Sequence, residues 1–289
     1  MSGELSDISF VIFVSFVVAG TLIMQRFTDS HVHVSSFTDA ELAAVLGRAH
    51  AAGVERVVVV GGNPEANEAV LRAAAARPGI ARAAVGFDRD CAAGAPDISA
   101  LEALVRQHAH VVAAIGEIGL DYHYSPETAP AQRALLASEL ELARHMNLPV
   151  IVHSRDADAD MLQLLRAHAA AWPGDRDRIG VLHCFTEDQP FAEALLGLGF
   201  MISFSGITTF RNAESLRAVA RTVPADRLLI ETDTPYLAPI PHRGKPNEPS
   251  FLPAVAACLA HERGETVEAI AAQTWRNAAR LFGWADTVK

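Results

Sequence analysis

Short apolar segments of strand length alternate with Ala- and Leu-rich stretches of helical length along most of the chain. The predicted strands are residues 26–29, 56–61, 81–86, 111–115, 149–152, 180–182, 200–203 and 228–230. The clearest helical stretches between them are residues 39–52, 64–77, 130–146, 156–171 and 187–198. Eight β/α units fit an α/β fold of the (β/α)8 TIM-barrel class, whose strands are parallel and buried. A doubly wound open sheet is the competing architecture, but no GxGxxG segment follows the first predicted strand.

No Pro- or Ser-rich linker divides this alternation, so we expect a single domain over residues 25–289 after an apolar N-terminal extension over residues 1–24. Residues 8–24 carry no charge, and their length is at the lower limit for a membrane span, which needs ~20 residues. No positive n-region precedes them, and no clear cleavage site follows. We expect Met24 to be the true start or the extension not to be an anchor. A membrane anchor or signal formed by residues 8–24 remains the alternative.

Composition narrows the class of protein. The 289 residues are 50% hydrophobic and 20% charged, which is typical of a globular chain with a sizeable core. A net charge of −10 argues against a broad basic surface for nucleic acid, but it leaves room for a local cationic site. Cys91, Cys184 and Cys258 form no CxxC pair, which indicates free thiols in a cytoplasmic protein.

Six residues with metal-binding side chains stand just after apolar runs, at the ends of predicted strands. They are His31, His33, Glu117, His153, His183 and Asp233. Because the carboxyl ends of barrel strands share one rim, we expect all six to meet there. His31 and His33 are two residues apart, so on an extended segment they point to the same side. Six other histidines fall on helical patterns, and we expect them at the surface: His50, His108, His110, His145, His168 and His261.

Imidazole and carboxylate ligands suit Zn²⁺, Mn²⁺ or a similar ion, whereas Mg²⁺ prefers more oxygen. The pair of histidines in His31-Val32-His33 and Asp233 can hold one ion, and two further histidines can hold a second, with Glu117 as the bridge. Since no activated Ser or Cys stands out, we expect the nucleophile to be a hydroxide that bridges two divalent ions. Asp233 can also accept the proton of the metal-bound water that becomes this hydroxide. Glu231 has the same strand parity as Asp233, so it either supports the site from behind the ligands or pairs with a buried Arg or Lys.

Several motifs together resemble those of the TatD-type deoxyribonucleases, which are metal-dependent TIM-barrel hydrolases related to the amidohydrolases. The similarity runs from about Met24 to residues 277–282, and its motifs keep their order and spacing. They are His31-Val32-His33, Gly116-Glu117-Ile118-Gly119-Leu120-Asp121-Tyr122, Val152-His153-Ser154-Arg155, Leu182-His183-Cys184-Phe185-Thr186, Ser203-Phe204-Ser205-Gly206, Glu231-Thr232-Asp233-Thr234-Pro235-Tyr236-Leu237 and Pro241-His242-Arg243-Gly244-Lys245-Pro246-Asn247-Glu248-Pro249.

The resemblance implies a phosphodiesterase that acts on DNA, with an exonuclease as our expectation. It implies that His31, His33, Glu117 and Asp233 bind one metal ion, and that Glu117, His153 and His183 bind the other. One departure concerns the turn after the third predicted strand, where such proteins often have Gly-Val-His-Pro. This chain has Gly86-Phe87-Asp88-Arg89, so a substrate contact by a histidine there is missing or replaced.

Four cationic or imidazole side chains are candidates for binding the substrate phosphates. Arg155 follows His153 by two residues, and a Pro- and Gly-bounded loop after the last strand contains His242, Arg243 and Lys245. Loops at this end of a barrel commonly carry function. Tyr122 and His123 either stack on a base or pack against the rim.

Three functions therefore compete. The first is a nuclease that acts on single-stranded DNA or DNA ends, has no stable protein partner, and touches a membrane only if residues 8–24 form a real segment. The second is a small-molecule amidohydrolase or lactonase with the same pair of ions. Glu117 weighs against it, since it occupies the position of a bridging carboxylated lysine. The third is a non-catalytic scaffold, against which the complete ligand set argues.

Overall fold

The structure is a computed structural model that describes residues 25–285. The predicted extension over residues 1–24, with its alternatives of start site, anchor and signal, lies outside the described residues. Within residues 25–285, no helix is both long and apolar enough to cross a membrane.

Eight parallel strands form one sheet in the order β1 to β8. A parallel bridge between Val32 and Thr234 joins the two edges, so the sheet closes into the expected (β/α)8 barrel. The strands are Phe27–Val32 (β1), Val54–Gly62 (β2), Ala81–Phe87 (β3), Val112–Asp121 (β4), Val150–Arg155 (β5), Gly180–Leu182 (β6), Met201–Phe204 (β7) and Leu228–Ile230 (β8).

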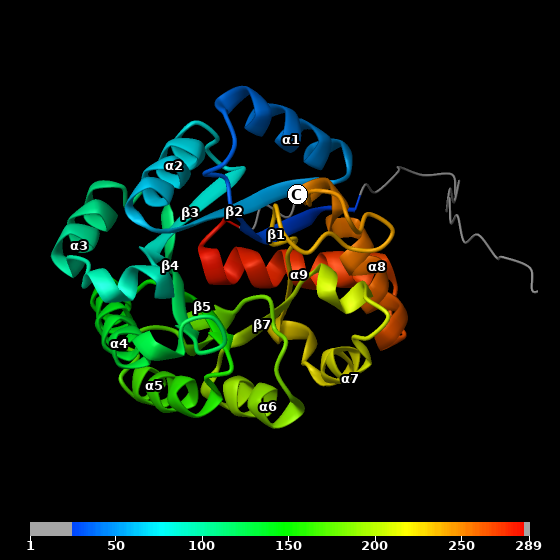
Figure 1. Ribbon diagram of the computed structural model, residues 1–289. Coiled ribbons are helices and arrows are strands. Elements are labelled where there is room, and N and C mark those ends of the chain that lie inside the picture. Colours follow the sequence, from blue (N-terminus) through cyan, green and yellow to red (C-terminus); the bar gives the residue numbers. More distant parts are fainter. Residues whose placement is uncertain (1–24, 286–289) are drawn as a thin grey trace, which may run out of the picture.

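The helices form a ring around this barrel (Figure 1). They are Asp39–Ala51 (α1), Pro64–Ala75 (α2), Ile98–Gln107 (α3), Ala129–Met146 (α4), Asp158–Ala170 (α5), Gln189–Leu198 (α6), Glu214–Thr222 (α7), Leu252–Arg263 (α8) and Val267–Phe282 (α9). Strand residues alternate between two cores. Val58 and Val60 of β2 belong to the core inside the barrel, whereas Val57 and Val59 belong to the core between sheet and helices.

Helix α9 closes the N-terminal end of the barrel and crosses the middle of the view in Figure 1. Its residues Ala278 and Phe282 join the core inside the barrel. Asn277 Nδ2 donates a hydrogen bond of 2.9 Å to the carbonyl of Leu228, the first residue of β8. The strands terminate at the opposite end, which is where barrels of this class carry their functional sites.

Two expectations differ from the structure. The predicted strand 111–115 extends to Asp121, because Ile118 to Asp121 continue to pair with β5, so Glu117 lies inside a strand rather than after one. Two glycines interrupt the apolar run there and concealed this extension. His168 was expected at the surface but is fully buried on the inner face of α5, where burial and the nearby Arg144 lower its pKa to about 4.

Candidate metal centre

The barrel brings together all six predicted ligands at the C-terminal ends of five strands. His31 lies in β1 and His33 just after it, Glu117 in β4 and His153 in β5. The other two, His183 and Asp233, lie just after β6 and β8. Each of the six has a nitrogen or oxygen within 4 Å of another member, and this set is called the ligand cluster below.

The Glu117 carboxylate lies at the middle of the ligand cluster, and its two oxygens face different partners. Oε2 is 3.4 Å from His31 Nε2 and 3.6 Å from His33 Nε2. Oε1 is 3.2 Å from His183 Nε2 and 3.5 Å from His153 Nδ1. Asp233 Oδ1 completes the first side, at 3.5 Å from His33 Nε2. Glu117 thus offers one carboxylate oxygen to each of two groups that could hold a metal ion.

The two glycines of the Gly116-Glu117-Ile118-Gly119 segment are explained by the close approach of β4 to β5. A Cβ atom added at Gly119 would lie 2.0 Å from the carbonyl oxygen of His153, and one added at Gly116 would lie 2.7 Å from Ile151 Cβ. Gly119 also has a φ of +153°, which disfavours other residues. Glycines on both sides of Glu117 thus allow β4 to bring its carboxylate beside His153.

A buried imidazole nitrogen beside Glu117 lacks a hydrogen bond, as expected for a metal ligand. Within the described chain, His183 Nε2 is buried with no hydrogen-bond partner, and it faces Glu117 Oε1. The His31 and His183 rings are stacked with centroids 3.9 Å apart. Burial alone would raise the pKa of Glu117, but the imidazoles of His183 and His31 lower it well below its ordinary value. The carboxylate is therefore stabilised by positive charge beside it, which divalent cations bound to neutral imidazoles also provide. The donor set fits a metal ion such as Zn²⁺ or Mn²⁺.

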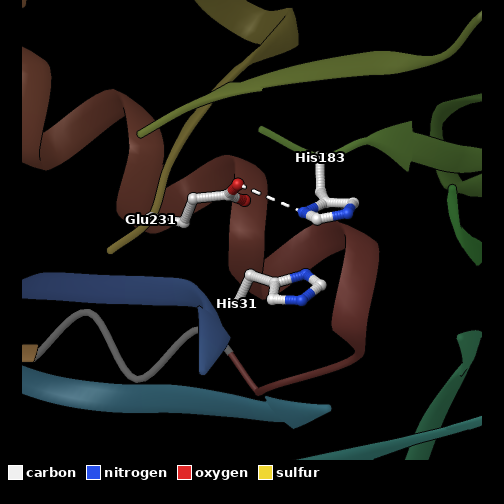
Figure 2. Close-up of side chains that lie close together, drawn as sticks. All are labelled: His31, His183 and Glu231. Carbon is white, nitrogen blue, oxygen red and sulfur yellow. Dashed lines mark ion pairs between the residues drawn. The ribbon is translucent and has the colours of Figure 1, made fainter. Parts of the chain in front are cut away.

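Glu231 supports the site from behind His183 (Figure 2). Its Oε1 lies 3.4 Å from His183 Nδ1 and accepts a hydrogen bond of 2.5 Å from the Cys184 backbone N–H. Its Oε2 accepts one of 2.6 Å from Ser203 Oγ. Of the two roles considered from sequence, pairing with Arg or Lys is wrong, since no such side chain contacts Glu231 among residues 25–285. A carboxylate behind an imidazole orients the ring and raises its basicity as a ligand.

Two further buried carboxylates fix the neighbouring elements. Asp121 Oδ2 lies 3.3 Å from His153 Nε2, and its Oδ1 accepts backbone hydrogen bonds from His123 and Tyr124. Although burial opposes it, these hydrogen bonds lower the pKa of Asp121 to about 2. Asp29 accepts hydrogen bonds from Thr232 Oγ1 and from the Thr232 and His31 backbones, and its burial raises its pKa to about 8. Asp29 thereby ties β1 to the segment that carries Asp233.

The four predicted phosphate-binding residues lie in loops at this end of the barrel. No hydrogen bond or ion pair joins them to the ligand cluster in the part of the chain that the structure describes. Arg155 lies 4.8 Å above the Tyr124 ring, and Arg243 lies 3.8 Å above the Phe210 ring. His242 stacks on Phe251, and Lys245 is exposed. Substrate contact by these four remains a prediction.

The turn that departs from the family pattern supplies a cation that sequence reasoning missed. Arg89 Nε lies 3.7 Å from Asp121 Oδ2, so its guanidinium is linked through Asp121 to His153. The Gly86-Phe87-Asp88-Arg89 sequence shows that a cation is present in this turn. Where the Arg89 side chain lies, however, depends on the path of the chain after β3. Tyr122 packs at the rim, where its hydroxyl donates to Asp160, and His123 pairs with Asp156.

A cavity of about 710 Å³ lies at the other end of the barrel and contains none of the six ligands. Arg26, just before β1, and the first residues of β2 line it, together with Trp275 and Trp284 near the end of the chain. It is therefore separate from the ligand cluster.

Comparison with known proteins agrees with this geometry. The family model described as TatD related DNase matches residues 28–283. The chain belongs to this family. It is thus a member of a family of metal-dependent hydrolases. The sequence motifs had already indicated a resemblance to this family.

Similar proteins cover different parts of this TatD-family chain. An uncharacterized metal-dependent hydrolase of Escherichia coli, YcfH, is 55% identical over 59% of the chain, and the matched part spans only 63% of that relative. YabD of Bacillus subtilis, also described as an uncharacterized metal-dependent hydrolase, is 37% identical over 88% of this chain and 98% of its own. The crystal structure of YjjV, a TatD homologue from Escherichia coli, has a TM-score of 0.81 at 33% identity and covers 91% of this chain and all of its own.

Proposed function

We propose that this TatD-family protein is a deoxyribonuclease that removes nucleotides from the ends of single-stranded DNA with two divalent metal ions. The observation that carries the proposal is the divided Glu117 carboxylate, with one set of ligands at each oxygen. A relative described as the 3'-5' ssDNA/RNA exonuclease TatD of Klebsiella pneumoniae supports it, at 36% identity over 83% of this chain and 90% of its own. Glu117 is also a carboxylate where a bridging carboxylated lysine would otherwise stand, which disfavours an amidohydrolase or lactonase.

Each residue of the ligand cluster has a separate task in this proposal. His31, His33, Asp233 and Glu117 would hold one ion, and His153, His183 and Glu117 would hold the other. Two divalent ions bound by these residues would supply an activated water as nucleophile and positive charge for the departing oxygen. Asp233 would accept the proton of the attacking water, because its carboxylate lies in the cluster, 3.5 Å from His33 Nε2 and 3.9 Å from His31 Nε2. Asp121 and Glu231 keep the His153 and His183 rings in place.

The cations around the cluster bind the phosphate diester. Arg89 and Arg155 lie on the His153 side, and the loop with His242, Arg243 and Lys245 follows Asp233 in the chain. Guanidinium groups form paired hydrogen bonds to phosphate oxygens, and they restrain the diester relative to the attacking water.

The test is cleavage of end-labelled single-stranded DNA by the full chain and by a form that starts at Met24. Mn²⁺, Mg²⁺ and Zn²⁺ are compared with EDTA, and labels at either end reveal polarity. Glu117→Gln and His153→Ala should lower kcat by at least about 100-fold. His261→Ala, which changes an exposed histidine on α8, is the matched control and should cleave like the wild type. Metal-independent cleavage, or equal cleavage by all variants, would contradict the proposal. Turnover of a lactone or amide but not of DNA would favour the amidohydrolase alternative.

A further inference from the structure

All three tyrosines of the chain lie at the rim that carries the ligand cluster. Tyr122 is half-buried and hydrogen-bonded to Asp160, but the Tyr124 and Tyr236 side chains are 63% and 60% exposed. They are the only exposed Phe, Tyr or Trp side chains among residues 25–285. Leaving such rings in water sacrifices apolar burial, and exposed aromatic rings beside a site commonly mark contact with a ligand.

Backbone hydrogen bonds hold Tyr236 beside Asp233, on one side of the ligand cluster. Its backbone N–H donates a hydrogen bond of 2.8 Å to the Asp233 carbonyl, and its own carbonyl accepts one of 2.7 Å from Asn247 Nδ2. Its ring centroid is 5.9 Å from that of His33, in an edge-on arrangement. The backbone at Tyr236 is therefore held by a proposed metal ligand, while the ring is open to solvent.

Tyr124 is positioned from the His153 side in a similar way. Its backbone N–H donates a hydrogen bond of 2.9 Å to Asp121, the carboxylate that contacts His153. Arg155 lies over one face of the ring and donates from Nη1 to the hydroxyl, at 3.3 Å. A base on this ring would thus have a guanidinium beside it for the adjoining phosphate.

The two rings belong to opposite sides of Glu117. Tyr236 lies beside His33, which faces Oε2, and Tyr124 is linked through Asp121 to His153, which faces Oε1. A diester bound between the two ligand sets would thus have one tyrosine on each side. With a net charge of −10, the chain can attract phosphates only locally, and base stacking would add to that affinity.

We propose that Tyr236 and Tyr124 are stacking platforms for unpaired bases on the two sides of the scissile phosphate. This inference rests on the proposed function and extends it, because it predicts that the substrate is a single-stranded polynucleotide rather than a small ester. Bases must be unpaired to stack on a protein ring, so duplex DNA binds only at frayed ends.

Steady-state kinetics on oligothymidylate and on methyl 2,2,2-trifluoroethyl phosphate, a small diester without bases or aromatic rings, test the inference. Tyr236→Leu and Tyr124→Leu should each raise KM for the oligonucleotide by about 5- to 150-fold, which corresponds to stacking one base at ~1–3 kcal/mol. kcat, and all constants for the small diester, should stay within about twofold. Tyr236→Phe and Tyr124→Phe should restore KM. Ile240→Ala is the matched control, since it removes exposed apolar surface from the same loop as Tyr236 without removing a ring.

Abasic residues placed singly along the oligonucleotide assign the two platforms. An abasic residue at the position that stacks on Tyr236 should raise KM for the wild type but should not raise it further for Tyr236→Leu. An abasic residue at the position that stacks on Tyr124 should likewise raise KM for the wild type but not further for Tyr124→Leu. Unchanged KM in both leucine variants would overturn the inference while leaving the nuclease intact, as would an equal loss on the small diester. A wild-type enzyme that cleaves neither phosphodiester would instead overturn the proposed function.

Discussion

Replacing Glu139 with glutamine should stabilise the protein, and increasingly so as the pH rises. Glu139 of α4 is fully buried, with Oε1 accepting a hydrogen bond of 2.7 Å from the Phe87 backbone at the end of β3. Oε2 has no hydrogen-bond partner within residues 25–285. Burial raises the pKa of Glu139 well above its ordinary value, and the negative charge of Asp88 adds to this.

The sign and size of this change in the free energy of unfolding follow from the number of protons bound in the folded and unfolded states. Because the pKa of Glu139 is raised on folding, its contribution to the free energy of unfolding is fully present below about pH 4.5 and is lost as the pH rises toward the folded pKa. Each pH unit in that interval costs the wild type about 1.4 kcal/mol. Glutamine keeps the acceptor for Phe87 but cannot ionise, so Glu139→Gln should not pay this cost.

Urea unfolding at pH 5, 6, 7 and 8 measures the difference between Glu139→Gln and the wild type. With an m-value of ~3 kcal/mol per molar urea, the two midpoints should separate by about 0.5 M per pH unit until the pH reaches the raised pKa of Glu139. Glu141→Gln, at an exposed position of the same helix, is the control and should show no such trend. A difference between Glu139→Gln and wild type that is the same at every pH would refute the reasoning.

Three other predictions concern the cluster and its supporting residues. Glu231→Gln should weaken divalent metal binding by about 10- to 100-fold in calorimetric titration, since it loses the carboxylate behind His183; unchanged affinity would exclude that support. EDTA should lower the melting temperature of the wild type, and Mn²⁺ at 1,000 times its dissociation constant should restore about 4 kcal/mol, with no such response in Glu117→Gln. His168 has a pKa lowered to about 4 by burial and Arg144, so the wild type should lose about 3 kcal/mol of stability as the pH falls from 6.5 to 4. His168→Leu should remove this loss, and equal acid sensitivity of the two proteins would contradict it.

The alternation of strand and helix periods and the motifs at the strand ends determined the fold class, the family and the set of six candidate ligands. These signals are local, because a side chain's direction follows from the period of its own element. The end of β4 was the weakest point, since Gly116 and Gly119 interrupt the apolar pattern although the strand continues. Those glycines are required by a neighbour that the local pattern does not reveal, namely the backbone of β5.

Only the tertiary structure decided which atoms meet. The division of the Glu117 oxygens, the contact of Glu231 with His183 and that of Arg89 with Asp121 join residues that are far apart in the chain, and closure of the barrel sets their distances. The same holds for exposure, since Tyr122 is half-buried while Tyr124, two residues later, is open to solvent. The sequence by itself thus determined the class of chemistry, because residue type and period are properties of a segment. Burial and interatomic distance are properties of the packed barrel, and these decided how the ligand cluster is arranged and which rings lie beside it.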